Sequence, residues 1–92
     1  MIPVTSTATP RLHPKARLQR DEVRGRDVLL YPEGLVALNA TGLEIVALCD
    51  GQRTLAEIVV TLERRYGASG LERDIGAFLE GLAAKGLVVY GP

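Results

Sequence analysis

The sequence predicts a small α+β domain in which a three-stranded antiparallel sheet precedes three helices. β-prone runs separated by turn residues come first, and three amphipathic segments with helix start and stop residues follow them. With 92 residues the chain has room for one hydrophobic core, and 47% of its residues are hydrophobic. We therefore expect one domain over residues 11–92, preceded at residues 1–10 by a flexible tail rich in Thr and Pro.

The clearest strand signal is a hairpin. Residues 28–31 and 35–38 are β-prone runs, and they flank a three-residue loop of Pro32, Glu33 and Gly34. We expect Gly34 to take the left-handed conformation of a bulged turn. A weaker alternation over residues 16–24 predicts a short edge strand, and residues 87–90 predict a short last strand.

The first helix is expected over residues 40–49. Asn39 or Thr41 would cap its start, and Gly51 would close its end in the left-handed conformation. Apolar residues surround most of this segment, so we expect it to be the central, buried helix.

The second and third helices each begin with a capping-box pattern. Thr54 precedes Glu57 by three residues, and Ser69 precedes Glu72 by the same spacing. The second helix carries apolar residues at spacings of three and four and ends at Gly67, and the third has a similar stripe before residue 86. A sheet followed by three short helices is the arrangement of a winged-helix-like domain.

Charge is balanced overall but not along the chain. Eleven Lys and Arg residues offset eleven Asp and Glu residues, which gives no general attraction to nucleic acid or to anionic lipid. Residues 11–26 hold six basic and two acidic residues, whereas residues 27–92 hold five basic and nine acidic ones. The basic segment leaves a winged-helix nucleic-acid-binding regulator as the alternative function. The mixed charges on the second and third helices disfavour DNA binding.

The sequence is poor in groups for catalysis or metal binding. One histidine, His13, and one cysteine, Cys49, supply neither a catalytic arrangement nor a ligand set. Cys49 lies in an apolar helix, where a buried, inert thiol is expected. The first residues lack a signal-peptide pattern, and no run approaches 18 apolar residues. We expect a cytoplasmic protein that is not an enzyme and has no cofactor, metal or membrane partner.

Recognition of a peptide or protein fits the remaining features. The strand at residues 35–38 offers an edge that an extended peptide could lengthen through main-chain hydrogen bonds. Opposite its core stripe, the third helix presents small residues that would leave a shallow trough: Gly76, Ala77, Gly81 and Ala84. The alternative for these small residues is helix filler or a close helix contact.

Six fragments, taken in order, carry a family resemblance: RLHPKARL (11–18), DEVR (21–24), LLYPEG (29–34), LN (38–39), LCDG (48–51) and RTLAEI (53–58). Together they resemble the PqqD family of pyrroloquinoline quinone biosynthesis. The resemblance implies a winged-helix-like peptide chaperone. Such a protein binds the ribosomal precursor peptide PqqA and presents it to PqqE, a radical S-adenosylmethionine enzyme that carries out the chemistry.

The resemblance also implies a site. In related precursor-peptide recognition elements the leader adds as a strand beside the third strand and against the third helix. Here that maps onto the following residues: Leu35, Val36, Ala37, Leu38, Asn39, Arg73, Ala77, Gly81, Ala84 and Lys85. Among them, Arg73 and Lys85 could engage leader carboxylates.

The basic segment and the oligomeric state complete the expectations. Arg17, Arg20 and Arg24 are candidates for docking the partner enzyme, and the peptide is the alternative partner for this basic segment. We expect a monomer in dilute solution, with exchange of the N-terminal arm and hairpin as a route to a domain-swapped dimer.

Overall fold

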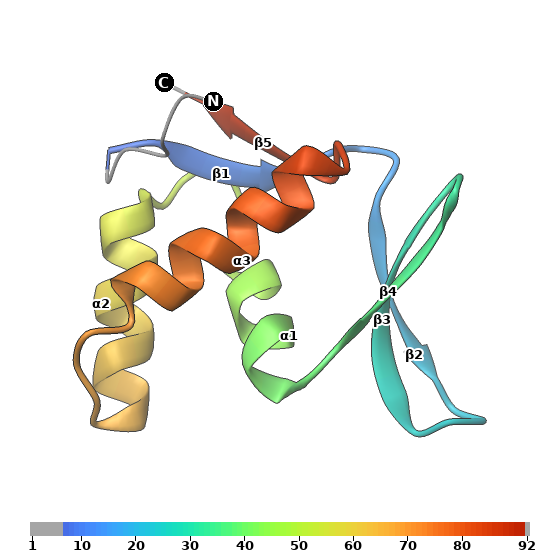
Figure 1. Cartoon of the computed structure of the whole chain (residues 1–92), viewed down its shortest axis with the longest axis horizontal. Coiled ribbons are helices and arrows are strands. Elements are labelled where there is room, and N and C mark those ends of the chain that lie inside the picture. The colour runs from blue at the N-terminus through green and yellow to red at the C-terminus, as the bar shows by residue number, and fades with distance from the viewer. Residues whose placement is uncertain (1–6, 92) are drawn as a thin grey trace.

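The computed structural model describes residues 7–91, which form five strands and three helices (Figure 1). The elements are β1 (Thr9–Leu12), β2 (Arg17–Asp21), β3 (Arg26–Tyr31), β4 (Gly34–Leu38), α1 (Ala40–Ala47), α2 (Leu55–Tyr66), α3 (Glu72–Ala84) and β5 (Val88–Gly91). The α+β class and the order of sheet and helices are thereby confirmed. Residues 1–6, part of the tail expected at residues 1–10, lie outside the described residues.

β2, β3 and β4 form the predicted antiparallel sheet, with β3 in its centre. The turn between β3 and β4 is shorter than predicted. Tyr31 pairs with Gly34, which leaves only Pro32 and Glu33 in the loop. The prediction of a left-handed conformation for Gly34 is wrong. Gly34 belongs to β4 and is not among the glycines of residues 7–91 with positive φ.

A second, two-stranded sheet lies apart from the first. β1 pairs with β5 in an antiparallel ladder, so the two ends of the described chain lie side by side (Figure 1). The backbone N–H of Leu55, at the start of α2, also donates a 2.8 Å hydrogen bond to the carbonyl of Ala8. Thr9 and Pro10, which were expected in the flexible tail, therefore belong to the folded domain.

The starts of α1 and α2 follow the sequence signals. The N–H of Gly42 donates to Oδ1 of Asn39 at 2.7 Å, so Asn39 is the cap of α1. The capping box of α2 has both of its bonds: the N–H of Glu57 donates to Oγ1 of Thr54 at 3.1 Å, and the N–H of Thr54 donates to Oε1 of Glu57 at 2.8 Å. Gly67 ends α2 with φ +63°. These predictions are confirmed.

Two helix boundaries differ from the predictions. α1 ends at Ala47, and Gly51, with φ +76°, lies beyond its end instead of closing it. Ser69 does not cap α3, whose cap residue is Leu71. The N–H of Leu71 donates to Oε2 of Glu63 at 3.0 Å, which ties the residue before α3 to α2.

The hydrophobic core lies between the inner face of the three-stranded sheet and the helices. Leu29, Ile58, Leu62 and Leu79 are fully buried, and they come from β3, α2 and α3. α1 adds Ile45 and Val46 to the same core, as its apolar sequence predicts. No helix within residues 7–91 combines the length and the apolar character of a membrane span.

Candidate functional site

β4 is an edge strand with one open side. It pairs with β3, and no part of residues 7–91 forms a strand on its other side. Val36 and Leu38 turn toward the core, whereas Leu35 is 48% exposed and Ala37 lies on the same solvent face as Leu35. The predicted site residues on β4 therefore lie on both faces of the sheet.

The register shows which backbone groups of β4 face the open edge. Hydrogen-bonded and non-hydrogen-bonded pairs alternate along an antiparallel ladder, and the pair that flanks a two-residue turn is hydrogen-bonded. Counting from the Tyr31–Gly34 pair, Val36 bonds to β3. Leu35 and Ala37 direct their N–H and C=O groups to the open edge, so a peptide added there would pair with these two residues.

A hollow of about 270 Å³ lies where α1, α2 and α3 meet. Its walls are formed by the apolar side chains of Ile45, Leu62, Leu71, Ile75 and Phe78. Asn39, Thr41 and Asp74, all exposed, add polar groups around it. Because Asn39 directly follows β4, this apolar hollow lies at one end of the open edge. Its lining suits a large apolar side chain.

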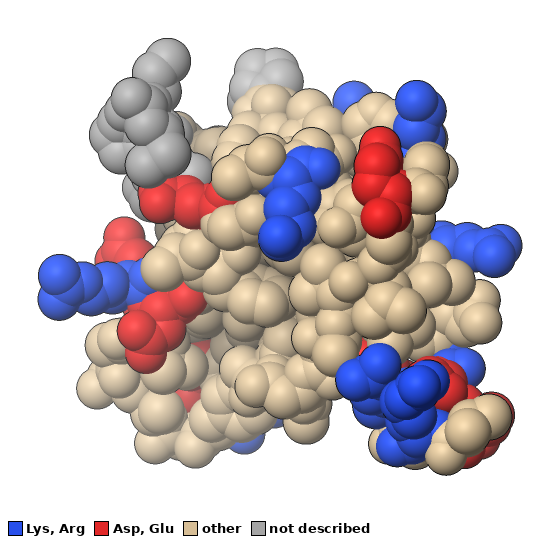
Figure 2. Space-filling model, turned by 45° about the vertical axis from the view of Figure 1, so that its right-hand side comes forward, with Lys and Arg blue, Asp and Glu red and all other residues tan. Residues whose placement is uncertain are grey.

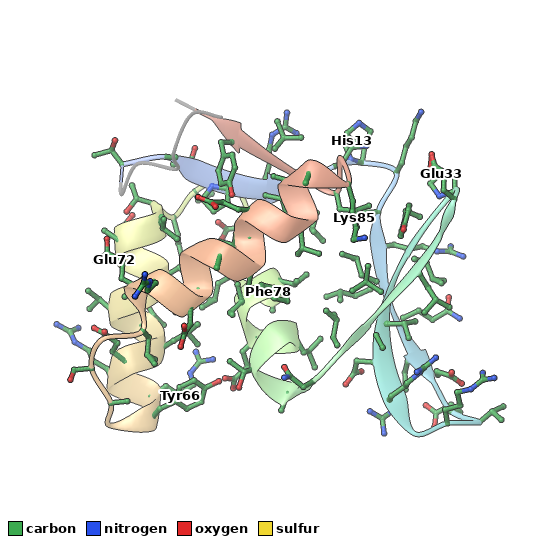
Figure 3. All side chains as sticks on the ribbon, in the orientation of Figure 1. His13, Glu33, Tyr66, Glu72, Phe78 and Lys85 are labelled. Atoms are coloured by element: carbon green, nitrogen blue, oxygen red, sulfur yellow. The ribbon has the colours of Figure 1, made fainter. Side chains whose placement is uncertain are left out.

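Phe78 forms one wall of the apolar hollow, and Figure 3 shows it between α3 and α1. A Cβ added to Gly42 would lie 3.3 Å from the Cζ atom of the Phe78 ring and 3.2 Å from Oδ1 of Asn39. Both distances are tighter than ordinary van der Waals contact. The glycine at position 42 therefore lets the aromatic ring approach α1 and fixes the width of the hollow.

Polar contacts hold the helices around the apolar hollow. The Tyr66 hydroxyl donates a hydrogen bond to the Glu44 carboxylate, which Arg65 also approaches at 3.5 Å. These contacts join the end of α2 to α1, and the bond from Leu71 to Glu63 joins the start of α3 to α2. Figure 3 shows Tyr66 directed from α2 toward α1.

The predicted residues Arg73, Ala77, Gly81 and Ala84 are exposed and follow one another on one face of α3, at spacings of four, four and three residues. Arg73 and Ala77 line a separate hollow of about 390 Å³ with Leu55. Lys85 lines another hollow, of about 210 Å³, beside the β3–β4 turn. Lys85 follows Arg73 by twelve positions, and twelve helical steps end roughly 120° from the starting face, which separates the two cations. Gly81 and Ala84 are exposed and line neither hollow.

The three arginines proposed for docking differ in their pairing. Arg20 contacts Asp27 at 3.2 Å, and Arg24 contacts Asp21 at 3.5 Å. Arg17 has no ion-pair partner within the described part of the chain. Figure 2 shows basic and acidic side chains mixed at the lower right, where the β2–β3 turn lies. The positive charge of residues 11–26 is thus partly neutralised by neighbouring carboxylates.

Cys49 has the environment of an inert thiol. Its Sγ is buried and donates a hydrogen bond to the carbonyl of Ile45 at 3.2 Å. Burial, with a smaller contribution from the charge of Asp50, raises the pKa of the Cys49 thiol to about 12. The thiol is protonated at neutral pH and is therefore a poor nucleophile.

Comparison with known proteins shows to which family this chain belongs. The sequence model of the family described as Coenzyme PQQ synthesis protein D (PqqD) matches residues 27–88. The chain belongs to the PqqD family. The matched residues of this PqqD-family chain contain the open edge of β4, the apolar hollow and all three helices.

Curated relatives agree with this assignment. A protein of Methylococcus capsulatus named PqqA binding protein is 47% identical over 77 residues, which cover 84% of this chain and 83% of the relative. A protein of the same name from Rhodopseudomonas palustris strain TIE-1 is 44% identical over 89 residues, covering 95% of this chain and 87% of the relative.

Two solved PqqD structures are also similar. The solution structure of the PqqD part of Methylobacterium extorquens PqqCD, described as a functional, stand-alone RiPP recognition element, has a TM-score of 0.80 at 35% identity and covers 94% of each chain. The crystal structure of PqqD from Xanthomonas campestris has a TM-score of 0.57 at 32% identity, covering 91% of this chain and 96% of that one.

Some residues of the site were not predicted from the sequence. Phe78 belongs to the apolar stripe of the third helix, which predicts a core position, yet it is only half-buried and lines the apolar hollow. The sequence indicates Tyr66 only as part of the apolar pattern of the second helix and Asp74 only as one of the mixed charges of the third, and neither is predicted for the site. One available signal was Gly42, because a glycine inside a short helix lowers helix propensity and often marks a close contact.

Proposed function

We propose that this PqqD-family chain binds the precursor peptide PqqA as an added strand on the open edge of β4 and presents it to the radical S-adenosylmethionine enzyme PqqE. One observation carries the proposal: the outward backbone groups of Leu35 and Ala37 lead directly to the apolar hollow at Asn39. The names of the curated relatives support PqqA as the ligand.

The two parts of the site supply different components of recognition. Main-chain hydrogen bonds along β4 hold any extended segment, so they contribute affinity with little sequence preference. The apolar hollow selects a large apolar side chain and so supplies specificity. A peptide held in this way is tethered to the enzyme at a raised effective concentration.

The chain itself would act without catalysis, cofactor or metal, as a monomer in the cytoplasm, where a ribosomal peptide is made. The buried thiol of Cys49 supports this role, since it leaves the chain without a reactive cysteine. The bond-forming chemistry would then belong to PqqE.

An NMR titration of the full chain with PqqA tests peptide binding. We expect the largest amide shifts at residues 34–39 and around Phe78 and Asp74, and small shifts in the exposed face of α2. A titration with duplex DNA serves as the comparison. No shift at saturating PqqA, or larger shifts with DNA than with the peptide, would reject the proposal.

Presentation to the enzyme needs a separate measurement. The rate of PqqA modification by PqqE is measured at a peptide concentration well below saturation, with and without this chain. We expect a higher rate with the chain present. An unchanged rate with demonstrated peptide binding would reject presentation and keep the peptide-binding role.

A further inference from the structure

A second hollow lies at the opposite end of β4 from the apolar hollow. It has a volume of about 210 Å³ and is formed by the β1–β2 connection, the β3–β4 turn and the end of α3. Three nitrogen-bearing side chains line it: His13, Lys15 and Lys85. Figure 3 shows His13 and Lys85 near the end of α3, with Glu33 across from them on the hairpin. We call this the basic hollow.

His13 is held in a fixed position within the basic hollow. Its N–H donates to the carbonyl of Leu87 at 2.9 Å, and its carbonyl accepts from the N–H of Ala16 at 2.9 Å. The N–H of Lys15 donates to the imidazole Nδ1 at 3.0 Å. Because Nδ1 accepts this bond, a neutral imidazole carries its proton on Nε2, which leaves that nitrogen as a donor for a ligand.

The charges around the basic hollow favour an anion. Within the described part of the chain neither Lys15 nor Lys85 has an ion-pair partner, and Glu33 is the single carboxylate that lines the hollow. Two ammonium groups and one imidazole N–H therefore outweigh one carboxylate. An ammonium group without a partner gains a charge-assisted hydrogen bond when a carboxylate enters.

The two hollows stand at the two ends of the same strand. Tyr31 and Glu33, which line the basic hollow, come just before β4, and Asn39, which lines the apolar hollow, comes just after it. The five residues of β4 span roughly 16 Å at about 3.3 Å per residue. A peptide strand lying along β4 therefore has its two ends at the two hollows.

We propose that the basic hollow binds a carboxylate side chain of the peptide held on β4. This carboxylate lies roughly four to six residues from the large apolar side chain that enters the apolar hollow. The inference rests on the proposed peptide-binding function. It extends that function because the length of β4 sets the spacing between an apolar residue and an acidic residue of the bound peptide.

The test measures PqqA affinity by calorimetry for the unmodified chain and for Lys85→Gln, Lys85→Arg and Arg64→Gln. Each Asp and Glu of PqqA is replaced in turn by Asn or Gln. We expect Lys85→Gln to weaken binding about 3- to 10-fold and Lys85→Arg to bind within about twofold of the unmodified chain. Arg64→Gln, which removes an exposed cation from the exposed face of α2, is the matched control and should leave the affinity unchanged.

One peptide variant should identify the bound carboxylate. It weakens binding to the unmodified chain as much as Lys85→Gln does, and it causes no further loss when combined with that variant. Equal losses for Lys85→Gln and Arg64→Gln, or purely additive losses for every peptide variant, would overturn the carboxylate site and leave peptide binding intact.

Two further outcomes would overturn the carboxylate site, each with a different consequence for peptide binding. Failure of the unmodified chain to bind PqqA at all would overturn the peptide-binding function and the carboxylate site together. NMR shifts at His13 and Lys85 with inorganic phosphate, without coupling to any peptide carboxylate, would assign the basic hollow to a free anion and overturn the inference alone.

Discussion

Phe78 on α3 packs against the backbone of α1 at Gly42, so closely that a Cβ on Gly42 would lie 3.3 Å from the aromatic ring. This contact sets the width of the apolar hollow, because both residues line it. The Phe78 ring is half-buried, so its position depends on the size of the residue at position 42, against which it packs.

Gly42→Ala is therefore expected to narrow the apolar hollow by displacing Phe78. We expect the dissociation constant for PqqA to rise about 3- to 10-fold. Stability should change little, because the gain of about 1 kcal/mol from replacing a helical glycine offsets the crowding. Gly76→Ala is the control: it lies in α3 with no atom near its added Cβ, and it should stabilise the fold without affecting PqqA affinity. Equal affinities for both variants would contradict this account of the hollow.

Ala37→Pro should remove an outward N–H from the open edge of β4 while the β3–β4 ladder stays intact. Proline is tolerated where the N–H of an edge strand faces solvent. We expect PqqA affinity to fall at least about tenfold. Val36→Pro is expected to unfold the hairpin instead, because Val36 bonds to β3.

The control for Ala37→Pro is Leu18→Pro, which removes an outward N–H from β2 at the opposite edge of the sheet. Heteronuclear NMR spectra check that each variant is folded. A folded Ala37→Pro variant with unchanged affinity would show that the peptide does not pair with β4.

Thr54→Ala should destabilise the domain by about 1 kcal/mol, since it removes the side chain that caps α2. Ser69→Ala is expected to change stability by less than about 0.5 kcal/mol, because Ser69 does not cap α3. Urea denaturation of the two variants compares these effects. Equal losses would mean that Ser69 also stabilises a helix start.

Stability should decrease at alkaline pH through Cys49. Its pKa is raised from 9.0 to about 12 in the folded chain, so the folded state keeps a proton that the unfolded chain loses in this range. The contribution of Cys49 to the free energy of unfolding is therefore fully present below pH 9. Above pH 9 it decreases by up to about 1.4 kcal/mol per pH unit. Unfolding curves of Cys49→Ala should lack this part of the slope, and identical slopes would contradict the burial of the thiol.

Arg17→Gln should weaken the complex with PqqE about 2- to 5-fold at low salt, because the Arg17 charge has no partner in the described part of the chain. Arg24→Gln should have a smaller effect, since Arg24 already contacts Asp21. Surface plasmon resonance with immobilised PqqE compares the variants. A larger effect at Arg24 would show that the enzyme docks at the β2–β3 turn and competes with Asp21.

The parts of the fold that could be predicted from the sequence depend on local signals. Thr54 and Glu57 are three residues apart, so the capping box is visible in the sequence, and the β3–β4 hairpin is equally local. β1 and β5 pair across almost the whole chain, and β1 is a short strand that contains Pro10. Neither this long-range pairing nor a short strand with a proline can be recognised in a short stretch of sequence. The β1–β5 sheet was therefore not predicted.

The site was predicted less completely than the fold, for the same reason. The strand at residues 35–38 could be named, but its outward groups depend on a register that starts at the Tyr31–Gly34 pair. His13 and Lys85 meet in one hollow although more than seventy residues separate them. The faces of α3 also depend on which helix packs against it, and therefore Arg73 and Lys85 could not be separated in advance.

The pairing of Thr9 with Gly91 has a consequence for protein engineering. Because the two ends of the described chain are neighbours in one ladder, a short linker could close the chain into a ring, and new termini could be opened in the exposed turn around Val23, which is 93% exposed. Such a circular permutant would keep β4 and its open edge uninterrupted. A carrier protein could then be attached at the far end of the three-stranded sheet instead of beside the β1–β5 pair.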